Sequence, residues 1–336
     1  MKQEDSYLKK NLRRWLPGVV ISIIALIVVF RLANWADLGA AFASIQPASI
    51  GAALVITLFS LVTKSMVWRT LLDNKPSLLQ TFFITNEGYF LNNILPLRAG
   101  EIGRAIFMGQ TSDLGTFHVL STIVIERAFD VAIAAGLLLA TLPMTLGMEG
   151  AASIAITSLL LIVVGFVVLF LMAQYNSQVK NFVEKVSKKS PLLEKILLPR
   201  IESLLNGLAV LTKPSQFFKS IFWVLVTWVL WVSLYYVMLL SIAPGAPLWW
   251  GAFVDSFLAL GMAVPSAPAG LGVYEASIVW ALQMIGVTST QALAYAIVLH
   301  FMQFVVTAVF GLIGLAREGH SIARLFEGMN NNKANT

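Results

Sequence analysis

Long runs of apolar residues recur along this chain, and they constrain its fold more than any other feature of the sequence. A helix needs about 20 apolar residues to cross the hydrocarbon core of a bilayer. The chain is 58% apolar and only 12% charged, whereas roughly a quarter of the residues of a soluble domain are charged. We therefore predict an all-α polytopic membrane protein with about six full spans, near residues 16–33, 48–68, 116–141, 151–174, 217–242 and 291–316.

Basic residues are distributed unevenly between the loops that join these runs. Lys and Arg cluster before residue 16, between 64 and 75, between 180 and 219 and after 316. The remaining loops, 34–47, 142–150, 243–248 and 287–290, contain neither. Because cytoplasmic loops carry the excess of Lys and Arg, we predict a multi-pass protein of the cell (inner) membrane with both termini in the cytoplasm.

Two further apolar stretches, 77–108 and 249–286, are each interrupted in the middle by proline and glycine. The span before 77–108 ends in the cytoplasm and the next span starts there, so this stretch must return to the side from which it entered. The same reasoning places the entry and return of 249–286 on the outer side. We predict two re-entrant helical hairpins; an even pair of complete crossings is the alternative for each.

The order of these segments repeats with opposite orientation. A span, an interrupted hairpin and a second span occupy 48–141, and the same series occupies 217–316 in the reverse direction. Interrupted segments at matching positions of two inverted halves indicate a transport site near the middle of the membrane. We therefore predict an inverted-topology repeat. The alternative is a bundle in which the hairpins are simple kinked helices.

The predicted domain organisation is simple. Residues 1–15 form a cytoplasmic tail, 16–316 form a membrane translocator domain, and 317–336 form a second cytoplasmic tail. Segment 175–216 is a basic, amphipathic cytoplasmic insertion that is expected to lie on the inner leaflet. The first apolar run is expected to be an uncleaved span, although its basic start also fits a signal peptide.

The first hairpin carries a concentration of polar residues around its predicted break. Pro96 cannot continue a helix, and Gly100 lets a ligand approach the backbone closely. Arg98 and Arg104 present planar, permanently charged groups that suit phosphate, and a helix starting near Ala99 would direct free N–H groups at an anion. Alternatively, Arg98 pairs with Glu101 and only fixes the turn. The candidate substrate-binding residues here are Asn92, Asn93, Arg98, Glu101 and Arg104.

The span at 116–141 contains three charged residues, Glu126, Arg127 and Asp130, well inside its length. Charges at this depth are costly, and they mark a functional site by default. Glu126 and Asp130 lie on one face of the helix because they are four residues apart. All three are candidate substrate-binding residues, and the alternative is a buried ion network that only fixes helix packing. Lys64 is expected to extend toward the cytoplasmic surface.

The second hairpin combines prolines and glycines with a few polar groups. We predict that Ser266, Gly270 and Tyr274 contribute to binding a lipid head group. Glu275 opens the returning half-helix, where the helix dipole favours a carboxylate, and it can neutralise Arg98 or Arg127 or accept a proton. Weaker candidates are Glu87, Asp255, His300 and Gln303. A single His or Gln in a span usually forms a hydrogen bond between helices.

Together, the segment Asn93–Arg104, the residues Glu126-Arg127 with Asp130, and the segment Pro265–Glu275 resemble the lysylphosphatidylglycerol synthase transmembrane (flippase-like) family. The resemblance covers roughly residues 15–316. It implies a likeness to the lipid-translocating half of the multiple peptide resistance factor, which moves aminoacylated phosphatidylglycerol between leaflets. Ala269 stands where the family pattern leads us to expect Gly. The soluble aminoacyl-transferase domain is missing, so this chain is not expected to synthesise the lysyl lipid.

We therefore expect a flippase-like translocator that moves a phosphate-bearing lipid, either aminoacylated or polyprenyl-linked, without ATP. Walker, zinc and nucleophile-elbow motifs are absent from the sequence. We expect no enzymatic activity, cofactor, metal or nucleic-acid partner. Its partners would be membrane lipids, with a homo-oligomer and a separate lipid synthase both compatible with the sequence. One alternative is a membrane enzyme or accessory subunit that acts on a lipid phosphate in lipid or glycan assembly, with Mg²⁺ held between Glu126 and Asp130. Another is a transporter of a small solute.

Overall fold

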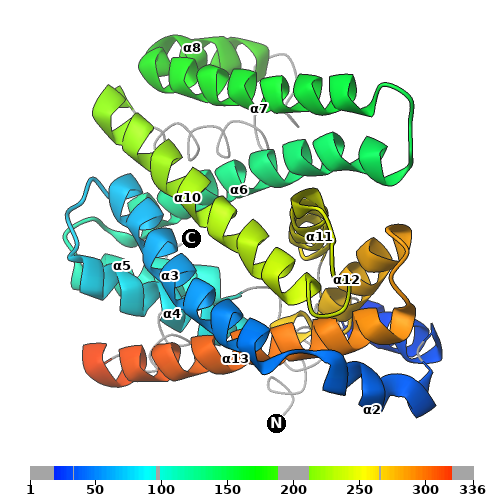
Figure 1. Ribbon diagram of the computed structural model, residues 1–336. Coiled ribbons are helices and arrows are strands. Elements are labelled where there is room, and N and C mark those ends of the chain that lie inside the picture. The colour runs from blue at the N-terminus through cyan, green and yellow to red at the C-terminus, as the bar shows by residue number, and fades with distance from the viewer. Residues whose placement is uncertain (1–18, 33, 96–98, 188–211, 265, 320–336) are drawn as a thin grey trace, which may run out of the picture.

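A computed structural model describes residues 19–32, 34–95, 99–187, 212–264 and 266–319 of this protein. The described residues form helices and connecting turns, as predicted, without a strand among them. The elements, shown in Figure 1, are α2 (Trp35–Ser44), α3 (Pro47–Leu71), α4 (Leu78–Ile94), α5 (Ala99–Thr111), α6 (Thr116–Thr145), α7 (Ala151–Gln174), α8 (Asn176–Ser187), α10 (Pro214–Leu239), α11 (Leu248–Gly261), the 3₁₀ turn η3 (Pro268–Gly270), α12 (Val273–Met284) and α13 (Ser289–Glu318).

Four of the described helices are long and apolar enough to cross a membrane, namely α3, α7, α10 and α13. A fifth crossing results if the helix Val19–Leu32 and α2 count as one span, although the two are bent by 90° at their junction. The predicted span at 116–141 is a single helix of 30 residues, α6. It is not among the apolar four, and it carries Glu126, Arg127 and Asp130 in its first half.

Both interrupted stretches are broken where the sequence predicted. The first consists of α4 and α5, and α5 begins at Ala99 as expected. Ser77 caps α4 by accepting a hydrogen bond from the Gln80 N–H at 3.1 Å. The second consists of α11, η3 and α12, and Gly272 precedes α12 with φ of +84°, a conformation that side chains other than that of Gly rarely adopt.

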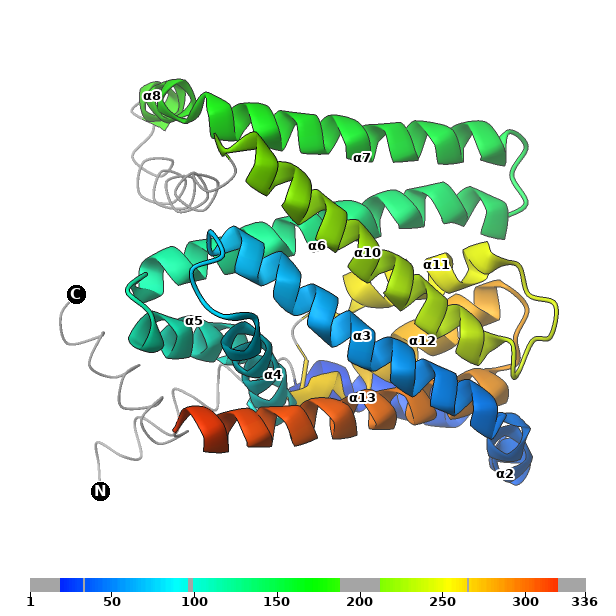
Figure 2. The same cartoon turned by 60° about the vertical axis from the view of Figure 1, so that its left-hand side comes forward.

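The two series of helices pack against each other as well as within themselves. Helix α3 lies along α10, α4 along α13, and α11 along α6. Figure 2 shows α3 and α10 crossing side by side between the layer of α6 and α7 and the layer of α13. Each hairpin therefore contacts the last helix of the other series, which brings the two breaks into the centre of the bundle.

The predicted insertion at 175–216 lies largely outside the described residues. Its first part is α8, which follows α7 directly. The leucine-rich stretch after it, together with the two tails at 1–15 and 320–336, lies outside what the structure describes. Most of α7 is exposed, since only 12% of its most apolar window is buried within the protein.

Candidate functional site

An ion-pair network joins α3, α5 and α6 in the centre of the bundle. Its members are Lys64, Glu101, Arg104, Glu126, Arg127 and Asp130. The side chain of Glu126 is fully buried at its centre. One of its oxygens, Oε2, accepts a hydrogen bond from Arg104 Nη2 at 2.6 Å, and the other, Oε1, lies 3.0 Å from both Lys64 Nζ and Arg127 Nη2.

Lys64 does not extend to the cytoplasmic surface, and that prediction is wrong. The residue is 1% exposed, and its Nζ lies 2.7 Å from Asp130 Oδ2 and 3.0 Å from Glu126 Oε1. The physical reason is that Glu126 and Asp130, four residues apart on α6, present two carboxylates to the face of α3. A buried carboxylate pair needs a cation nearby, and this need was the signal in the sequence for the role of Lys64.

The three cations of the network differ in exposure. Arg104 is 2% exposed, and its guanidinium lies 4.1 Å from the ring centre of Trp68, whose Nε1 donates to Thr122. The Arg127 side chain is 31% exposed, and it lies 3.5 Å from Asp130 and 3.6 Å from Glu101. Arg127 is therefore the one cation of this network that reaches accessible space.

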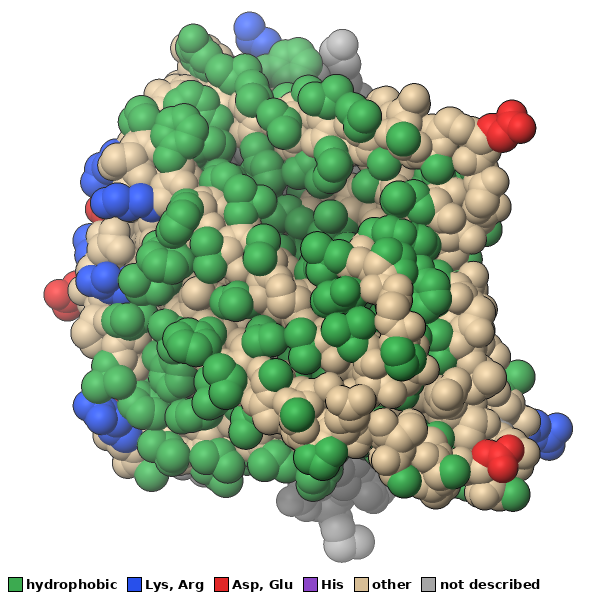
Figure 3. Space-filling view, in the orientation of Figure 1, with side chains coloured by type: hydrophobic (Ala, Val, Ile, Leu, Met, Phe, Trp, Pro, Cys, Tyr) green, Lys and Arg blue, Asp and Glu red, His purple; other side chains and the backbone are tan. Residues whose placement is uncertain are grey.

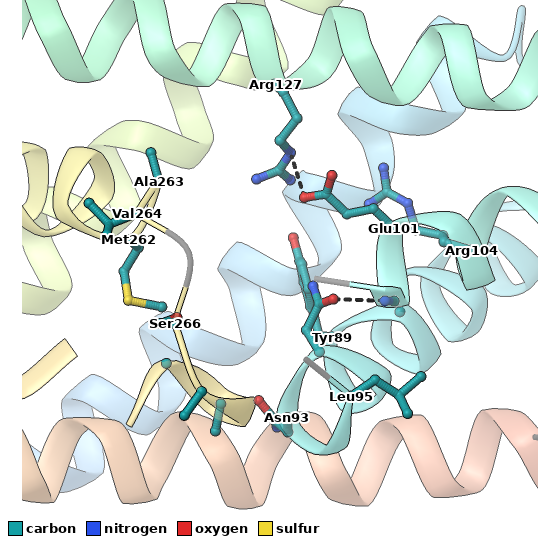
Figure 4. A pocket seen from close by; sticks show the side chains of 16 residues that line it. Tyr89, Asn93, Leu95, Glu101, Arg104, Arg127, Met262, Ala263, Val264 and Ser266 are labelled. Atoms are coloured by element: carbon teal, nitrogen blue, oxygen red, sulfur yellow. Dashed lines mark hydrogen bonds and ion pairs between the residues drawn. The ribbon is translucent and has the colours of Figure 1, made fainter. Parts of the chain in front are cut away.

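A first cavity of about 340 Å³ opens between the tips of the two hairpins. Figure 4 shows Arg127 entering it from α6 above Glu101, while Met262, Val264 and Ser266 face it from the second hairpin. The N-terminus of α5 also lines it through Gly100, whose N–H donates to Asn92 Oδ1 at 2.9 Å. The tips of both interrupted stretches therefore meet at one cavity, as the sequence predicted.

Close contact between backbones explains glycine at the crossing of α4 and α5. A Cβ atom added to Gly100 would lie 2.0 Å from the carbonyl oxygen of Gly88 and 2.9 Å from the backbone nitrogen of Asn92. Neither atom can move without shifting α4. The first hairpin can therefore fold back on itself at this distance only with glycine at position 100.

His300 of α13 holds the tip of the second hairpin. Its Nδ1 lies 2.6 Å from Glu275 Oε1, its Nε2 lies 3.0 Å from the carbonyl oxygen of Ala269, and its ring stacks on Tyr274. Glu275 Oε2 accepts a hydrogen bond from the Gly272 N–H at 2.7 Å. The carboxylate of Glu275 is thus engaged by His300 and by the start of α12, and it forms no ion pair with Arg127.

Ala269 is held in the left-handed backbone region, with φ of +60°. Glycine adopts this conformation without steric cost, whereas alanine does not. The structure therefore gives a conformational reason for the glycine that the family pattern led us to expect here. The hydrogen bond to His300 stabilises the strained residue.

A second cavity of about 310 Å³ lies between α3, α10, α11 and α13 and shares one wall with the first. Residues that line both cavities are Tyr89, Asn92, Asn93, Arg127, Met262 and Ala269. The second cavity also contains Asp255, Tyr235, Tyr274 and Gln303. Arg127 thus stands at the boundary between the two spaces.

The structure places most of the predicted site residues around these cavities. The first cavity is lined by Asn92, Asn93, Glu101, Arg104, Arg127, Ser266 and Gly270, and the second by Tyr274 as well as by the shared residues. Glu126 and Asp130 form ion pairs with Arg127, and Glu275 contacts His300 at the second hairpin. Arg98 lies outside the described residues, so its role stays a prediction.

Sequence reasoning missed several residues of this region. Lys64, Trp68 and Tyr89 were not placed at the site, although all three contact the network or the cavities. His300 was expected as a hydrogen bond between helices, and it is one. The alternative function requires Mg²⁺ between Glu126 and Asp130. The ammonium group of Lys64 occupies that position in the structure.

Comparisons with known proteins agree with this architecture. The sequence model of a family described as "Lysylphosphatidylglycerol synthase TM region" matches residues 15–311. A curated relative, the UPF0104 membrane protein MJ1078 of Methanocaldococcus jannaschii, is 23% identical over 233 residues, which is 67% of this chain and 92% of the relative. Neither description states a transport activity.

Proposed function

Because the chain belongs to the lysylphosphatidylglycerol synthase transmembrane-region family, we propose that this multi-pass membrane protein moves a phosphate-bearing lipid between the leaflets. In this proposal the lipid, either aminoacylated or polyprenyl-linked, is not changed chemically and no nucleotide is consumed. The observation that carries the proposal is the first cavity, where the tips of two hairpins meet around the accessible guanidinium of Arg127.

The helix packing supports an inverted repeat as the framework for this movement. If α3 to α6 correspond to α10 to α13, the three most extensive contacts between the halves match one another. The contact of α4 with α13 corresponds to that of α11 with α6, and the contact of α3 with α10 corresponds to itself. Such a repeat lets one half rock against the other around a site at their interface.

The surface supports the proposed orientation. In Figure 3, hydrophobic side chains cover the broad middle of the face, and Lys and Arg gather mainly along its left edge. The end of α3, the start of α10 and the end of α13 lie at the same edge in Figure 1. By the excess of positive charge this edge is cytoplasmic, and the two hairpins then enter from opposite sides of the membrane.

Charge balance indicates how the head group would bind. The described network contains three cations (Lys64, Arg104 and Arg127) and three anions (Glu101, Glu126 and Asp130). A phosphate must therefore compete with carboxylates for Arg127 or use other donors. The N-terminus of α5, where the helix dipole favours an anion, lines the first cavity at Gly100, and Arg98 is the predicted additional cation.

Reconstitution with a fluorescent phospholipid tests the proposal. Liposomes containing the purified protein are expected to expose inner-leaflet lipid to a membrane-impermeant quencher faster than empty liposomes do. Arg127→Gln is expected to reduce the rate at least tenfold, whereas Arg317→Gln, which alters a half-exposed arginine at the end of α13, should not. A correctly folded Arg127→Gln protein that moves lipid at the wild-type rate would show that the site assignment is wrong.

A further inference from the structure

The second cavity contains a buried carboxylate that the ion-pair network does not explain. Asp255 of α11 is 4% exposed, and its Oδ2 is buried and accepts no hydrogen bond from the described residues. It also forms no ion pair with any cation among them. A buried charge without a partner is strongly unfavourable, so such a group binds a cation or takes up a proton.

The cations nearest to this cavity are already engaged elsewhere. Lys64 and Arg127 line it, but both pair with Asp130 and Glu126. The remaining basic group on its wall is His300, and this residue is engaged by Glu275 and Ala269. The described protein therefore offers Asp255 no counterion of its own.

The surroundings of Asp255 suit a small cation better than a large one. The other titratable groups on the wall of this cavity are Lys64, Tyr89, Arg127, Tyr235, Tyr274 and His300. Ser60, Tyr235, Tyr274 and Gln303, whose side chains carry hydroxyl or amide oxygens, also line this space. The C-terminal end of α11 lies nearby through Met262, and the C-terminal ends of broken helices commonly coordinate Na⁺ or H⁺ in transporters.

We infer that the second cavity is a site for an exchangeable monovalent cation, a proton or Na⁺, with Asp255 as its anionic ligand. The site shares Arg127 and Asn93 with the lipid-facing first cavity, so occupancy of one space affects the wall of the other. That this cation is coupled to lipid movement rests on the proposed function. Cation binding itself does not depend on it.

Binding is tested on the full-length protein purified in detergent, without any lipid-movement assay. To test Na⁺, thermal unfolding is followed while NaCl replaces choline chloride at constant ionic strength. To test a proton, the carboxylic acid C=O stretch is followed by infrared spectroscopy during a pH titration in choline chloride. We expect either a saturable rise of Tm with Na⁺ or a titrating carboxyl band. Asp255→Asn should abolish that signal, and Asp113→Asn, which changes an exposed carboxylate, should retain it.

Two results would overturn the cation site: neither signal in the wild-type protein, or a signal that survives in Asp255→Asn. Asp255→Glu, which keeps the charge, should retain the signal and serves as the second variant if the Asn variant does not fold. Coupling is then tested in proteoliposomes under an imposed Na⁺ or pH gradient. A rate of lipid movement that neither gradient changes would refute coupling. A complete lack of lipid movement would refute the proposed function but not the cation site.

Discussion

The buried carboxylates beside the two cavities differ in whether they have a cationic partner. Beside the first, every described carboxylate has a cation within 3.6 Å, and the fully buried Glu126 is contacted by three. In the second, Asp255 has no such cation among the residues that the structure describes. A satisfied network fixes helices in place, while an unsatisfied carboxylate needs an exchangeable partner. The comparison teaches that the described ion-pair network satisfies its own charges over most of its extent, with Arg127 as its accessible edge.

The largest expected difference between the two regions is in stability. Glu126→Gln removes a charge that three cations share and leaves Lys64 and Arg104 buried with less compensation. Breaking a buried ion pair from one side costs about 3–5 kcal/mol. Asp255→Asn should instead be neutral or stabilising, because it removes an uncompensated charge. Thermal unfolding in detergent measures both variants, with Glu149→Gln on the exposed α6–α7 turn as the control.

Equal losses of stability in Glu126→Gln and Asp255→Asn would contradict this comparison. That outcome would mean that Asp255 has a structural partner after all. A stable Glu126→Gln protein would mean that the three cations find enough solvation without the carboxylate.

The next largest effect concerns the backbone contact within the first hairpin. Gly100→Ala places a methyl group 2.0 Å from a carbonyl oxygen of α4 and should destabilise the protein by about 1–3 kcal/mol. Gly165→Ala is the matched control, because nothing lies within 4 Å of its added Cβ on α7. It should stabilise the helix by about 0.5–1 kcal/mol. Opposite shifts of Tm are expected, and a Gly100→Ala protein as stable as the wild type would refute the close packing.

Much of the fold could be predicted from the sequence because membrane insertion leaves few choices. Apolar runs, loop charges and the two Pro/Gly breaks predicted helices at 47–71, 214–239 and 289–318 and the start of α5 at Ala99 to within a few residues. The first run was also predicted closely, at 16–33 against a helix at Val19–Leu32. Helix α2, which follows after a bend of 90°, was assigned to a loop because no proline or apolar run marks its start. Whether each run crosses the bilayer completely depends on tilt and packing, which composition does not encode.

Some residues of the candidate site could be predicted from the sequence, but their pairing could not. Spacing on one helix placed Glu126 and Asp130 on a common face, which the contacts of Lys64 confirm. Pairing between helices depends on how α3, α5 and α6 are rotated, and no local pattern specifies that rotation. For this reason Lys64 was assigned to the surface, and Asp255 could not be told apart from a carboxylate with a partner.

A smaller effect is expected at the tip of the second hairpin. His300→Leu removes the hydrogen bonds to Glu275 and to the carbonyl of Ala269. Hydrogen bonds between membrane helices contribute about 0.6 kcal/mol on average, so Tm should fall only slightly. Amide hydrogen exchange at 269–273 should quicken instead, because the left-handed Ala269 loses its support. His118→Leu at the start of α6 is the control; unchanged exchange in His300→Leu would show that the tip is held by other contacts.

The smallest expected effect is that of Glu101 of the first cavity, where a substitution should change ligand affinity with little change in stability. Glu101 lies 3.6 Å from Arg127 with both side chains about one-third exposed, so Glu101→Gln should change stability by less than about 1 kcal/mol. In the proposed function Glu101 would compete with a phosphate for the same guanidinium, so its removal should tighten binding of a short-chain phospholipid by about two- to fivefold, which corresponds to about 0.4–1 kcal/mol. Isothermal titration in detergent measures this, with Glu149→Gln as the control. Weaker binding in Glu101→Gln would mean that the carboxylate orients Arg127 for the ligand, and the first cavity would then rely on its ion pairs for binding as much as for stability.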